Sequence, residues 1–282
     1  MTYRTPLRYP GGKARISSFI KELIRENSLT GKSYIEPFAG GAGVALELLF
    51  SGCVGRIYLN DYNLSIYSFW RAVLEKNDKF CERIAEVPVN IDEWQKQKDI
   101  QKSASSAHFF DLGFSTFFLN RTNRSGIILA GVIGGKEQAG KWKMDARYNK
   151  ENLIKRIKSI GLFSSKISIS NEDAKVYLKN IARKQKSNSL LYLDPPYYVK
   201  GEGLYEHHFK DADHKELFEE ITKKAYPYWM VSYDNEPFIK KLYDGYNEIV
   251  YSLSYSAASP TTGKEIVFFS KNLVIPNRKI LD

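Results

Sequence analysis

The stretch SYIEPFAGGAGVALELLFSGCVGRIYLND, residues 33–61, contains the unit from which the fold can be inferred. Ser33 to Glu36 and Arg56 to Asn60 are typical of short strands, and a helix is predicted between them from about Val44 to Phe50. A glycine-rich turn joins the first strand to the helix, and Asp61 follows the second strand. Strand, helix and strand in this order build parallel sheets.

The same alternation returns in the last third of the chain. The candidate strands there are Lys166 to Ser170, Ser189 to Leu193 and Trp229 to Tyr233, with a hairpin formed by Ile249 to Tyr255 and Glu265 to Ser270. Helices are predicted over Ser17 to Asn27 and Asp213 to Lys224. We therefore expect an α/β protein with a Rossmann-like sheet and helices on both faces.

The middle of the chain departs from this alternation. Helices are predicted over Tyr67 to Leu74 and His108 to Leu119, and a glycine-rich loop follows them. Between Asn120 and Lys158 there are ten Lys and Arg residues and three acidic ones, which is +7 of the net charge of +10. Because pattern and charge change together, we expect a domain of residues 1–65 and 160–282, interrupted by a mainly helical domain of residues 66–159 with a basic loop.

Composition narrows the class of protein. With 282 residues, 43% hydrophobic and 26% charged, the chain can build a packed core. Two cysteines exclude a disulfide framework, and the four histidines lack zinc-ligand spacing, so we expect no metal site. The most apolar stretch, 126–135, is far shorter than the ~20 residues that span a bilayer. We expect a soluble cytoplasmic protein without membrane contact, whose positive charge favours a polyanionic partner.

The glycine-rich turn from Glu36 to Gly43 suggests a nucleotide-like ligand. Glycines allow a ligand to approach the backbone, and the helix that follows presents free N–H groups. Asp61, at the end of the next strand, can accept both hydroxyls of a ribose. The dinucleotide fingerprint fails because position 46 is Leu, and the two candidate phosphate loops, ending at Lys13 and Lys141, lack the required residues. The turn instead favours an S-adenosyl-L-methionine site.

Asp194-Pro-Pro-Tyr197 follows an apolar strand and carries the sharpest chemical signal. The two prolines stiffen the turn and remove two N–H donors, which leaves carbonyl groups able to accept hydrogen bonds. A carboxylate and a carbonyl held together can accept both hydrogens of an exocyclic amine. The tyrosine can stack on a planar base.

In the order of its motifs the chain resembles the DNA adenine N6-methyltransferases of the Dam-like (D12) class. The resemblance covers about residues 5 to 275, with Ala42 where many relatives have glycine. The matching motifs are Pro10-Gly-Gly-Lys13, Glu36-Pro-Phe-Ala-Gly-Gly41, Leu119-Asn-Arg121, Asn171-Glu-Asp173, Asp194-Pro-Pro-Tyr197, Ser232-Tyr-Asp-Asn235 and Gly263 to Asn272.

The resemblance implies transfer of a methyl group from S-adenosyl-L-methionine to N6 of an adenine flipped out of double-stranded DNA. It implies that the cofactor is bound by Tyr9, Lys13, Glu36, Phe38, Ala39, Gly40, Asp61 and Asp173. It implies that the target base is held by Asp194, Pro195, Pro196 and Tyr197. The inserted domain would then recognise the target, and a cognate restriction endonuclease is a candidate partner of a monomeric enzyme.

Within the insert, polar and basic residues are the candidates for DNA contact. Arg121, Asn123 and Arg124 are candidates for reading base edges, and Lys141, Lys143 and Arg147 for contacting phosphates. Tyr205 and the pair His207-His208 follow the Asp-Pro-Pro-Tyr turn. They are either part of a lid or DNA contact, or ordinary surface residues without a role in the reaction. The five phenylalanines between Phe109 and Phe118 fit a helical core better than a stacking surface.

Two other functions stay open on the sequence. The Asp-Pro-Pro-Tyr turn also suits a cytosine-N4 methyltransferase or an enzyme acting on RNA. A relative that binds DNA without catalysis is the other alternative, and the presence of Lys13, Asp61 and Asp194 together counts against it. The motif order favours adenine in DNA.

Overall fold

The computed structural model describes residues 4–8, 13–185, 189–198, 209–223, 226–255 and 261–281. The chain forms two compact units. We call Gly11–Asp61 with Glu172–Asp282 the sheet unit, and Met1–Pro10 with Tyr62–Asn171 the helical unit. The domains expected from the sequence divide the chain after residues 65 and 159, whereas the units divide it after residues 61 and 171 and place Met1–Pro10 in the helical unit.

The described strands form one mixed, seven-stranded sheet in the order β3-β2-β1-β4-β5-β7-β6. β1 pairs in parallel with β2 and β4, and β4 with β5, while β7 runs antiparallel between β5 and β6. The strands are β1 (Ser33–Glu36), β2 (Arg56–Asn60), β3 (Ile167–Ser170), β4 (Ser189–Leu193), β5 (Trp229–Asp234), β6 (Asn247–Tyr255) and β7 (Thr261–Phe269). The expected hairpin is confirmed, although its turn, residues 256–260, lies outside the described part.

The order of the strands reverses between β1 and β4. These strands are neighbours, with Tyr34 opposite Leu190, yet β1 is followed in sequence by β2 and β4 by β5 on the other side. In open α/β sheets, ligands bind at the carboxyl ends of the strands where the order reverses. The carboxyl ends of β1, β2 and β4 lead to Glu36, Asp61 and Asp194, so the topology brings these carboxylates to one edge.

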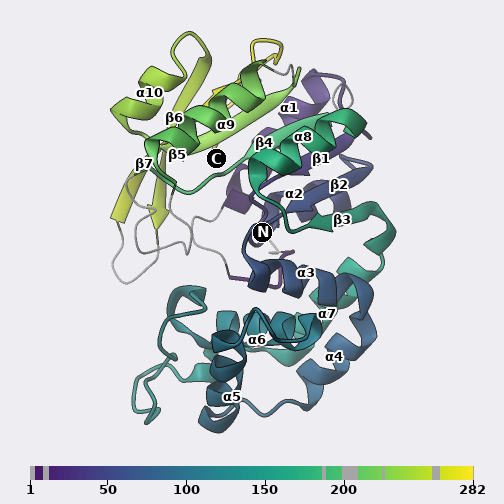
Figure 1. The fold of residues 1–282 in the computed structure, drawn as a ribbon, viewed down its shortest axis with the longest axis vertical. Coiled ribbons are helices and arrows are strands. Elements are labelled where there is room, and N and C mark those ends of the chain that lie inside the picture. Colours follow the sequence, from purple (N-terminus) through teal and green to yellow (C-terminus); the bar gives the residue numbers. More distant parts are fainter. Residues whose placement is uncertain are drawn as a thin grey trace. The chain divides into compact units, whose positions relative to one another are not determined.

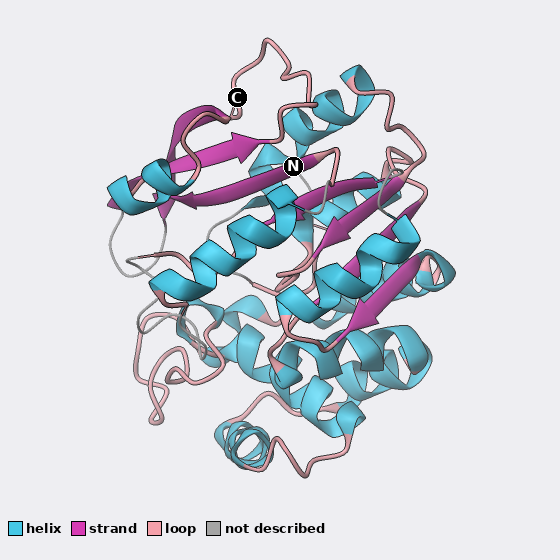
Figure 2. Cartoon of the chain, turned by 45° about the horizontal axis from the view of Figure 1, so that its top comes forward, coloured by secondary structure: helices cyan, strands magenta, loops and turns pink. Residues whose placement is uncertain are grey.

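Helices cover both faces of the sheet (Figure 2), which confirms the expected Rossmann-like architecture. On one face, α8 (Ala174–Gln185), α9 (Asp211–Lys223) and α10 (Pro237–Leu242) bury an apolar cluster. Its members include Leu178, Leu191, Leu217, Val231, Ile239 and Phe268. Because side chains alternate along a strand, Tyr192 and Phe269 point to the other face. There Phe269 meets Phe19 of α1 (Ser17–Glu26), with ring centroids 6.0 Å apart.

The helical unit is built around the buried helix α6 (Phe109–Thr122). The helices packed in this unit (Figure 1) are α3 (Leu64–Glu75), α4 (Asn77–Glu86), α5 (Ile91–Lys102) and α7 (Lys150–Gly161). Phe110, Phe114, Phe117 and Phe118 are buried, and Phe117 stacks on Phe69 with an interplanar angle of 8°. The interpretation of these phenylalanines as core is therefore confirmed, apart from the half-buried Phe109.

The residue at which a helix begins is set more by its capping residue than by the spacing of its apolar residues. The Asn63 side chain accepts hydrogen bonds from the N–H groups of Ser65 (2.9 Å) and Ile66 (3.2 Å), so α3 begins at Leu64, earlier than predicted. None of the helices in the described segments is both long and apolar enough to cross a membrane.

Candidate functional site

The turn after β1 is fixed by hydrogen bonds to the end of β2. The Ala39 N–H donates to the Asn60 carbonyl (2.9 Å), and the Gly40 N–H donates to Oδ2 of Asp61 (2.8 Å). Helix α2 (Gly43–Phe50) begins without a side-chain cap. Ala42, at its N-cap, is left-handed with φ 46°, a conformation that suits glycine and costs alanine roughly 1–2 kcal/mol. The structure thus joins Ala39 and Gly40, which follow Glu36 in the turn, to the end of β2 and to Asp61, and their contact with a cofactor stays a prediction.

Asn60 joins a third segment to this turn, a role that no sequence pattern indicated. Its amide donates to the carbonyls of Pro37 (3.1 Å) and Glu172 (3.0 Å), and its Oδ1 accepts from the Glu172 N–H (2.9 Å). Asp173, the next residue, accepts from the Lys175 N–H (2.9 Å) and so caps α8. Asp173 therefore directly follows a segment that is tied to the turn, and its contact with a cofactor stays a prediction.

Glu36 is a buried carboxyl group with no positively charged partner among the described residues. Its side chain lies at the end of β1, and Oε2 has no hydrogen-bond partner among the described residues. Burial raises the pKa of Glu36 well above its usual range, and the negative charge of Asp194 adds to this. Such an oxygen suits a cationic ligand, because a nearby positive charge would offset both the cost of burying the carboxylate and its repulsion from Asp194.

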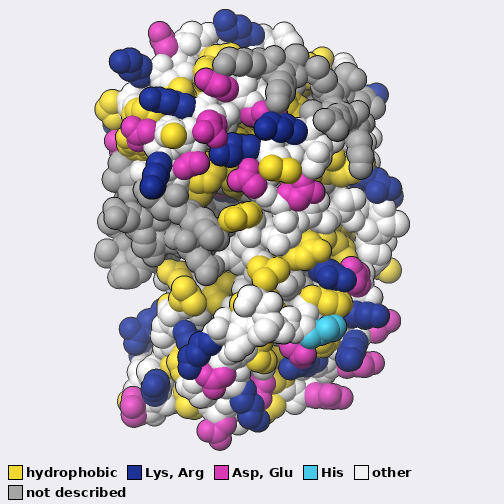
Figure 3. Space-filling view, in the orientation of Figure 1, with side chains coloured by type: hydrophobic (Ala, Val, Ile, Leu, Met, Phe, Trp, Pro, Cys, Tyr) yellow, Lys and Arg dark blue, Asp and Glu magenta, His cyan; other side chains and the backbone are white. Residues whose placement is uncertain are grey.

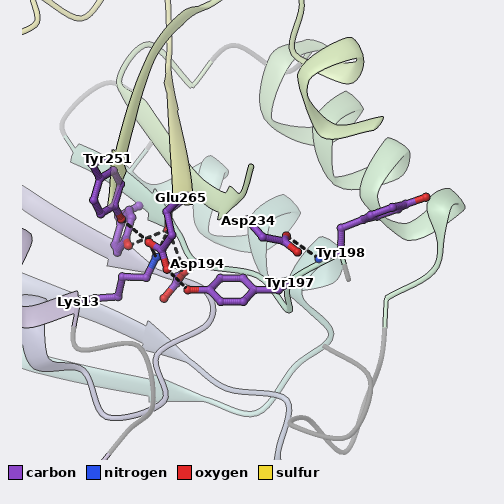
Figure 4. A network of polar contacts seen from close by, with 9 residues as sticks. Lys13, Asp194, Tyr197, Tyr198, Asp234, Tyr251 and Glu265 are labelled. Atoms are coloured by element: carbon purple, nitrogen blue, oxygen red, sulfur yellow. Dashed lines mark hydrogen bonds and ion pairs between the residues drawn. The ribbon is translucent and has the colours of Figure 1, made fainter. Parts of the chain in front are cut away.

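Lys13, at the start of the helical turn η1 (Lys13–Ile16), links two carboxylates (Figure 4). Its Nζ lies 2.7 Å from Oε2 of Glu265 and 3.2 Å from Oδ1 of Asp194, and it donates to Oγ of Ser232 at 3.2 Å. These contacts use all three donors of the ammonium group. Burial alone would lower the pKa of Lys13, but the surrounding groups, Asp194 foremost, raise it well above its usual range.

Asp194 keeps one oxygen open. Its side chain is 24% exposed, and both Lys13 and the Ser232 hydroxyl (2.8 Å) contact Oδ1. Oδ2 has no hydrogen-bond partner among the residues the structure describes. Burial raises the pKa of Asp194; Lys13 lowers it and the negative charge of Glu265 raises it, with a net upward shift. The residue therefore presents a carboxylate oxygen that can accept a further hydrogen bond.

The tyrosine of the turn is anchored rather than loose. Tyr197 is buried, its hydroxyl donates to Oε1 of Glu265, and Lys13 Nζ lies 5.4 Å from its ring centroid. Tyr198, by contrast, points away in Figure 4, and its backbone N–H donates to Oδ1 of Asp234 (2.8 Å). Of the two prolines in the turn, Pro195 is buried and Pro196 is half-buried.

The other predicted residues of the sheet unit are placed less completely. Phe38 is half-buried, and its ring meets Phe209 edge-on with centroids 5.8 Å apart. Tyr9, Tyr205 and the pair His207-His208 lie outside the described residues. The structure therefore joins Lys13 with Asp194 and Tyr197, and separately joins the Glu36 turn with Asp61.

In the helical unit, four arginines lie close together, and none of them is paired with a carboxylate of the described residues. The pKa of Arg121 is lowered to about 9, mainly by burial and then by the charges of Arg156, Arg8 and Arg147. Arg8 donates to the Asn123 carbonyl (3.0 Å) and Arg156 to the Thr5 carbonyl (2.8 Å), while Nε of Arg121 is buried without a partner in the described structure. No ion pair of the described residues involves this arginine cluster.

The arginine cluster indicates an anion-binding position more specifically than the overall charge of the helical unit does. On the face drawn in Figure 3, basic side chains of this unit are interspersed with acidic ones. Like charges held together in a partly buried place are costly unless an anion joins them. The arrangement therefore fits an anionic ligand, and it includes Arg8 and Arg156, which the sequence did not single out.

Asn123 has a structural role, which corrects its interpretation as a base reader. It is completely buried, and its Oδ1 accepts from the Trp94 indole N–H at 2.7 Å. Its amide donates to the carbonyls of Ile127 (3.1 Å) and Ile128 (2.8 Å), so every group that could read a base is occupied.

The remaining DNA candidates lie between α6 and α7, in residues 123–149, which we call the braced loop. Arg124, Lys141 and Arg147 are exposed, and so is Lys143, whose ammonium donates to the Gln138 carbonyl. The Gln138 side chain also donates to the Ile133 carbonyl (2.8 Å) and accepts from the Met144 N–H (2.9 Å). These bonds fix the loop internally, so its exposed side chains are presented on an ordered backbone.

Glu265, Ser232 and Tyr251 complete the network around Asp194, and no role was predicted for them from the sequence. For Glu265, the sequence signal is a glutamate placed directly before the apolar run Ile266 to Phe269. Its partner Lys13 is 252 positions away, so the pairing could not be inferred from local pattern.

Comparison with known proteins agrees with this geometry. The family described as D12 class N6 adenine-specific DNA methyltransferase matches residues 9–256. Among curated proteins, the chain is similar to the type II methyltransferase M.MjaIII of Methanocaldococcus jannaschii. The two are 23% identical over 265 residues, which are 86% of this chain and 88% of the relative.

Two solved methyltransferase structures are distantly similar. TrmN from Thermus thermophilus is 13% identical with a TM-score of 0.38, over 92% of this chain and 51% of that one. The rRNA methyltransferase aviRa from Streptomyces viridochromogenes is 10% identical with a TM-score of 0.39, over 93% and 86%. These scores are too low to bear on the substrate.

Proposed function

The chain belongs to the D12 class N6 adenine-specific DNA methyltransferase family, and from this premise we propose how its residues carry out the reaction. The methyl donor is S-adenosyl-L-methionine, and the acceptor is N6 of an adenine flipped out of duplex DNA. The observation that carries the proposal is the open Oδ2 of Asp194 at the end of β4, where the strand order reverses. A restriction endonuclease with the same recognition sequence is the partner that this activity suits.

The turn after β1 fits S-adenosyl-L-methionine. The buried Glu36 carboxylate has an oxygen without a partner among the described residues, and this donor carries a sulfonium and an ammonium group. Asp61 directly follows the neighbouring strand β2, a position at which a carboxylate can accept ribose hydroxyls. When bound, S-adenosyl-L-methionine supplies an electrophilic methyl group.

Asp61 provides a test of cofactor binding. Asp61→Asn keeps an oxygen that can accept from the Gly40 N–H but removes the charge, and we expect it to weaken S-adenosyl-L-methionine binding about tenfold. Isothermal titration calorimetry measures the change, with the exposed Asp244→Asn as the matched control. An unchanged dissociation constant in the Asp61 variant would remove Asp61 from the site.

The catalytic turn acts on the amine of the target base. The N6 lone pair of adenine is delocalised into the ring and attacks poorly. Oδ2 of Asp194 and the Pro195 carbonyl accept the two N–H bonds, which lets the nitrogen become pyramidal and its lone pair localise. As N6 attacks the methyl carbon, the bond from that carbon to sulfur breaks and the donor leaves as a neutral thioether. The fixed acceptors stabilise the positive charge that N6 gains, and N6 then releases one of its two protons to solvent, directly or through Asp194.

The target adenine reaches this turn only outside the helix. Flipping costs a few kcal/mol of unstacking and unpairing. Tyr197 recovers part of this by stacking on the base, and its hydroxyl bond to Glu265 holds the ring in one position. No covalent bond to the protein is needed in this scheme.

DNA contact by the helical unit is supported by the arginine cluster. Arg121 has an unpartnered Nε in the described structure, and Arg8, Arg147 and Arg156 surround it with like charge. A DNA phosphate would supply the missing negative charge and accept in a bidentate manner. We therefore assign Arg121 to a phosphate rather than to a base edge.

The fluorescence of Trp142 provides a test of whether the braced loop also contacts DNA. Of the four tryptophans, Trp142 is 66% exposed, while Trp70, Trp94 and Trp229 are buried. It lies between Lys141 and Lys143, so we expect duplex DNA to quench its fluorescence by contact with bases or backbone. Trp142→Phe should abolish the change; DNA binding detected by anisotropy without any quenching in wild type would place the loop away from DNA.

Transfer of labelled methyl groups tests the proposed function. The purified protein is incubated with methyl-tritiated S-adenosyl-L-methionine and either adenine-containing duplex DNA, adenine-free G·C duplex or RNA. We expect label only in the adenine-containing DNA. Label in the G·C duplex or in RNA would overturn the proposed substrate, and label nowhere would overturn the proposed donor or activity.

A further inference from the structure

Glu265 is a fully buried carboxylate that accepts hydrogen bonds from three separate segments among the residues that the structure describes. Lys13 precedes α1, Tyr197 belongs to the catalytic turn and Tyr251 lies on β6. A buried charge is tolerated only when it is paired and hydrogen-bonded, and this one is. Burial would raise the pKa of Glu265, but Lys13 and the tyrosine hydroxyls bring it below its usual value, so it is ionised at neutral pH.

The backbone fixes the place of this carboxylate. Glu265 lies on β7, between β5 and β6, and is in register with Asp234 on one side and Tyr251 on the other. Lys13 and Tyr197, in contrast, come from segments that precede a helix and follow a strand. Glu265 is therefore a rigid point to which two active-site groups are tied (Figure 4).

The distances from Lys13 to the two carboxylates show how Glu265 affects the ion pair of Asp194. The Lys13 ammonium lies 2.7 Å from Glu265 and 3.2 Å from Asp194, so its shorter contact is with Glu265. Without that carboxylate, Lys13 would pair with Asp194 alone and compete with the amine for its oxygens. The Tyr197 ring would lose the acceptor of its hydroxyl at the same time.

We propose that Glu265 is a positioning residue for methyl transfer, which draws Lys13 off Asp194 and holds Tyr197 in place beside the target base. The inference rests on the proposed function of Asp194. Glu265 touches neither donor nor base in this scheme, and it acts through Lys13 and Tyr197. If Glu265 had a purely structural role and only satisfied buried donors, its replacement would lower kcat without moving the acid limb of the pH profile.

The pH profile separates the two roles because Asp194 must be ionised to accept the amine. Activity then falls as pH falls through the pKa of Asp194. Removing the negative charge of Glu265 lowers that pKa, and closer pairing with Lys13 lowers it again, so the acid limb moves to lower pH. The titratable groups that face Asp194 in the described structure are Lys13, Tyr34, Glu36, Tyr192, Tyr197, Tyr251 and Glu265.

The experiment compares Glu265→Gln with wild type and with Glu248→Gln in the full chain. Glu248 is an exposed glutamate on the neighbouring strand β6, so the control makes the same chemical change outside the network. We expect Glu265→Gln to lower kcat about ten- to hundredfold. Dissociation constants for S-adenosyl-L-methionine and DNA should stay near wild type, and the acid limb of kcat should shift to lower pH. Glu248→Gln should match wild type.

The proposal is overturned if folded Glu265→Gln keeps the wild-type kcat, or if kcat falls while the acid limb stays in place. If circular dichroism shows that Glu265→Gln does not fold, Glu265→Asp is measured instead. That variant keeps the charge but shortens the tie, so we expect a lower kcat with an unmoved acid limb, and a wild-type kcat would overturn the proposal. An inactive wild type would contradict the proposed function itself, whereas an active wild type with an indifferent Glu265 contradicts only this inference.

Discussion

Replacing Asp194 by alanine is expected to slow methyl transfer about 10²–10³-fold, the cost typical of removing one preorganised group from a site of developing charge. The open Oδ2 disappears in this variant, so the adenine amine keeps its lone pair in the ring. Lys13 retains Glu265, and DNA and donor binding should therefore change little. Single-turnover rates, with binding measured separately by anisotropy and calorimetry, check this result.

Two further variants make the Asp194 result specific. Asp194→Asn keeps the shape and one carbonyl oxygen but loses the charge, and we expect a smaller decrease in rate than in the alanine variant. Asp244→Ala removes an exposed carboxylate of the same unit and should leave the rate unchanged. A wild-type rate in the Asp194→Ala variant would exclude Asp194 from the chemistry.

Replacing Arg121 by methionine is expected to weaken DNA binding about 10²-fold, because a bidentate, charge-assisted hydrogen bond to phosphate is removed. The slope of log affinity against log salt should become shallower by about 0.9 for each phosphate that the variant no longer neutralises. The exposed Lys155→Gln on α7 is the matched control, and its effect should be small. Fluorescence anisotropy with a duplex at several salt concentrations measures both quantities.

The same Arg121 variant should make the free protein more stable. Burial and three neighbouring arginines lower the pKa of Arg121 to about 9, which means that its charge is disfavoured in the folded state at neutral pH. Methionine fills a similar volume without charge, so we expect the free energy of unfolding to rise by roughly 1–3 kcal/mol. Unchanged DNA affinity together with lower stability would show that the cluster is structural and not a phosphate site.

The sheet could be predicted from the sequence because its inner strands are short apolar runs with clear ends. The bounds of β1, β2 and β4 agree with the predicted Ser33–Glu36, Arg56–Asn60 and Ser189–Leu193. The residues that follow these strands could be predicted to lie together as well, since parallel strands bring their carboxyl ends to one edge.

The contacts inside the site were beyond the reach of local pattern. Lys13 was predicted to bind the cofactor, and the sequence did not indicate that its ammonium group contacts Glu265, Asp194 and Ser232. Asn123 has the residue type of a base reader, and only its burial against Trp94 reveals its structural role. The arginine cluster needs Arg8 beside Arg121, two residues that only the folded chain joins.

The most direct test of the account is nucleoside mass spectrometry of unmethylated duplex DNA after incubation with S-adenosyl-L-methionine and either the wild-type protein or Asp194→Ala. We expect N6-methyladenine from the wild type and none above background from the variant. N4-methylcytosine, or equal N6-methyladenine from both proteins, would contradict this expectation.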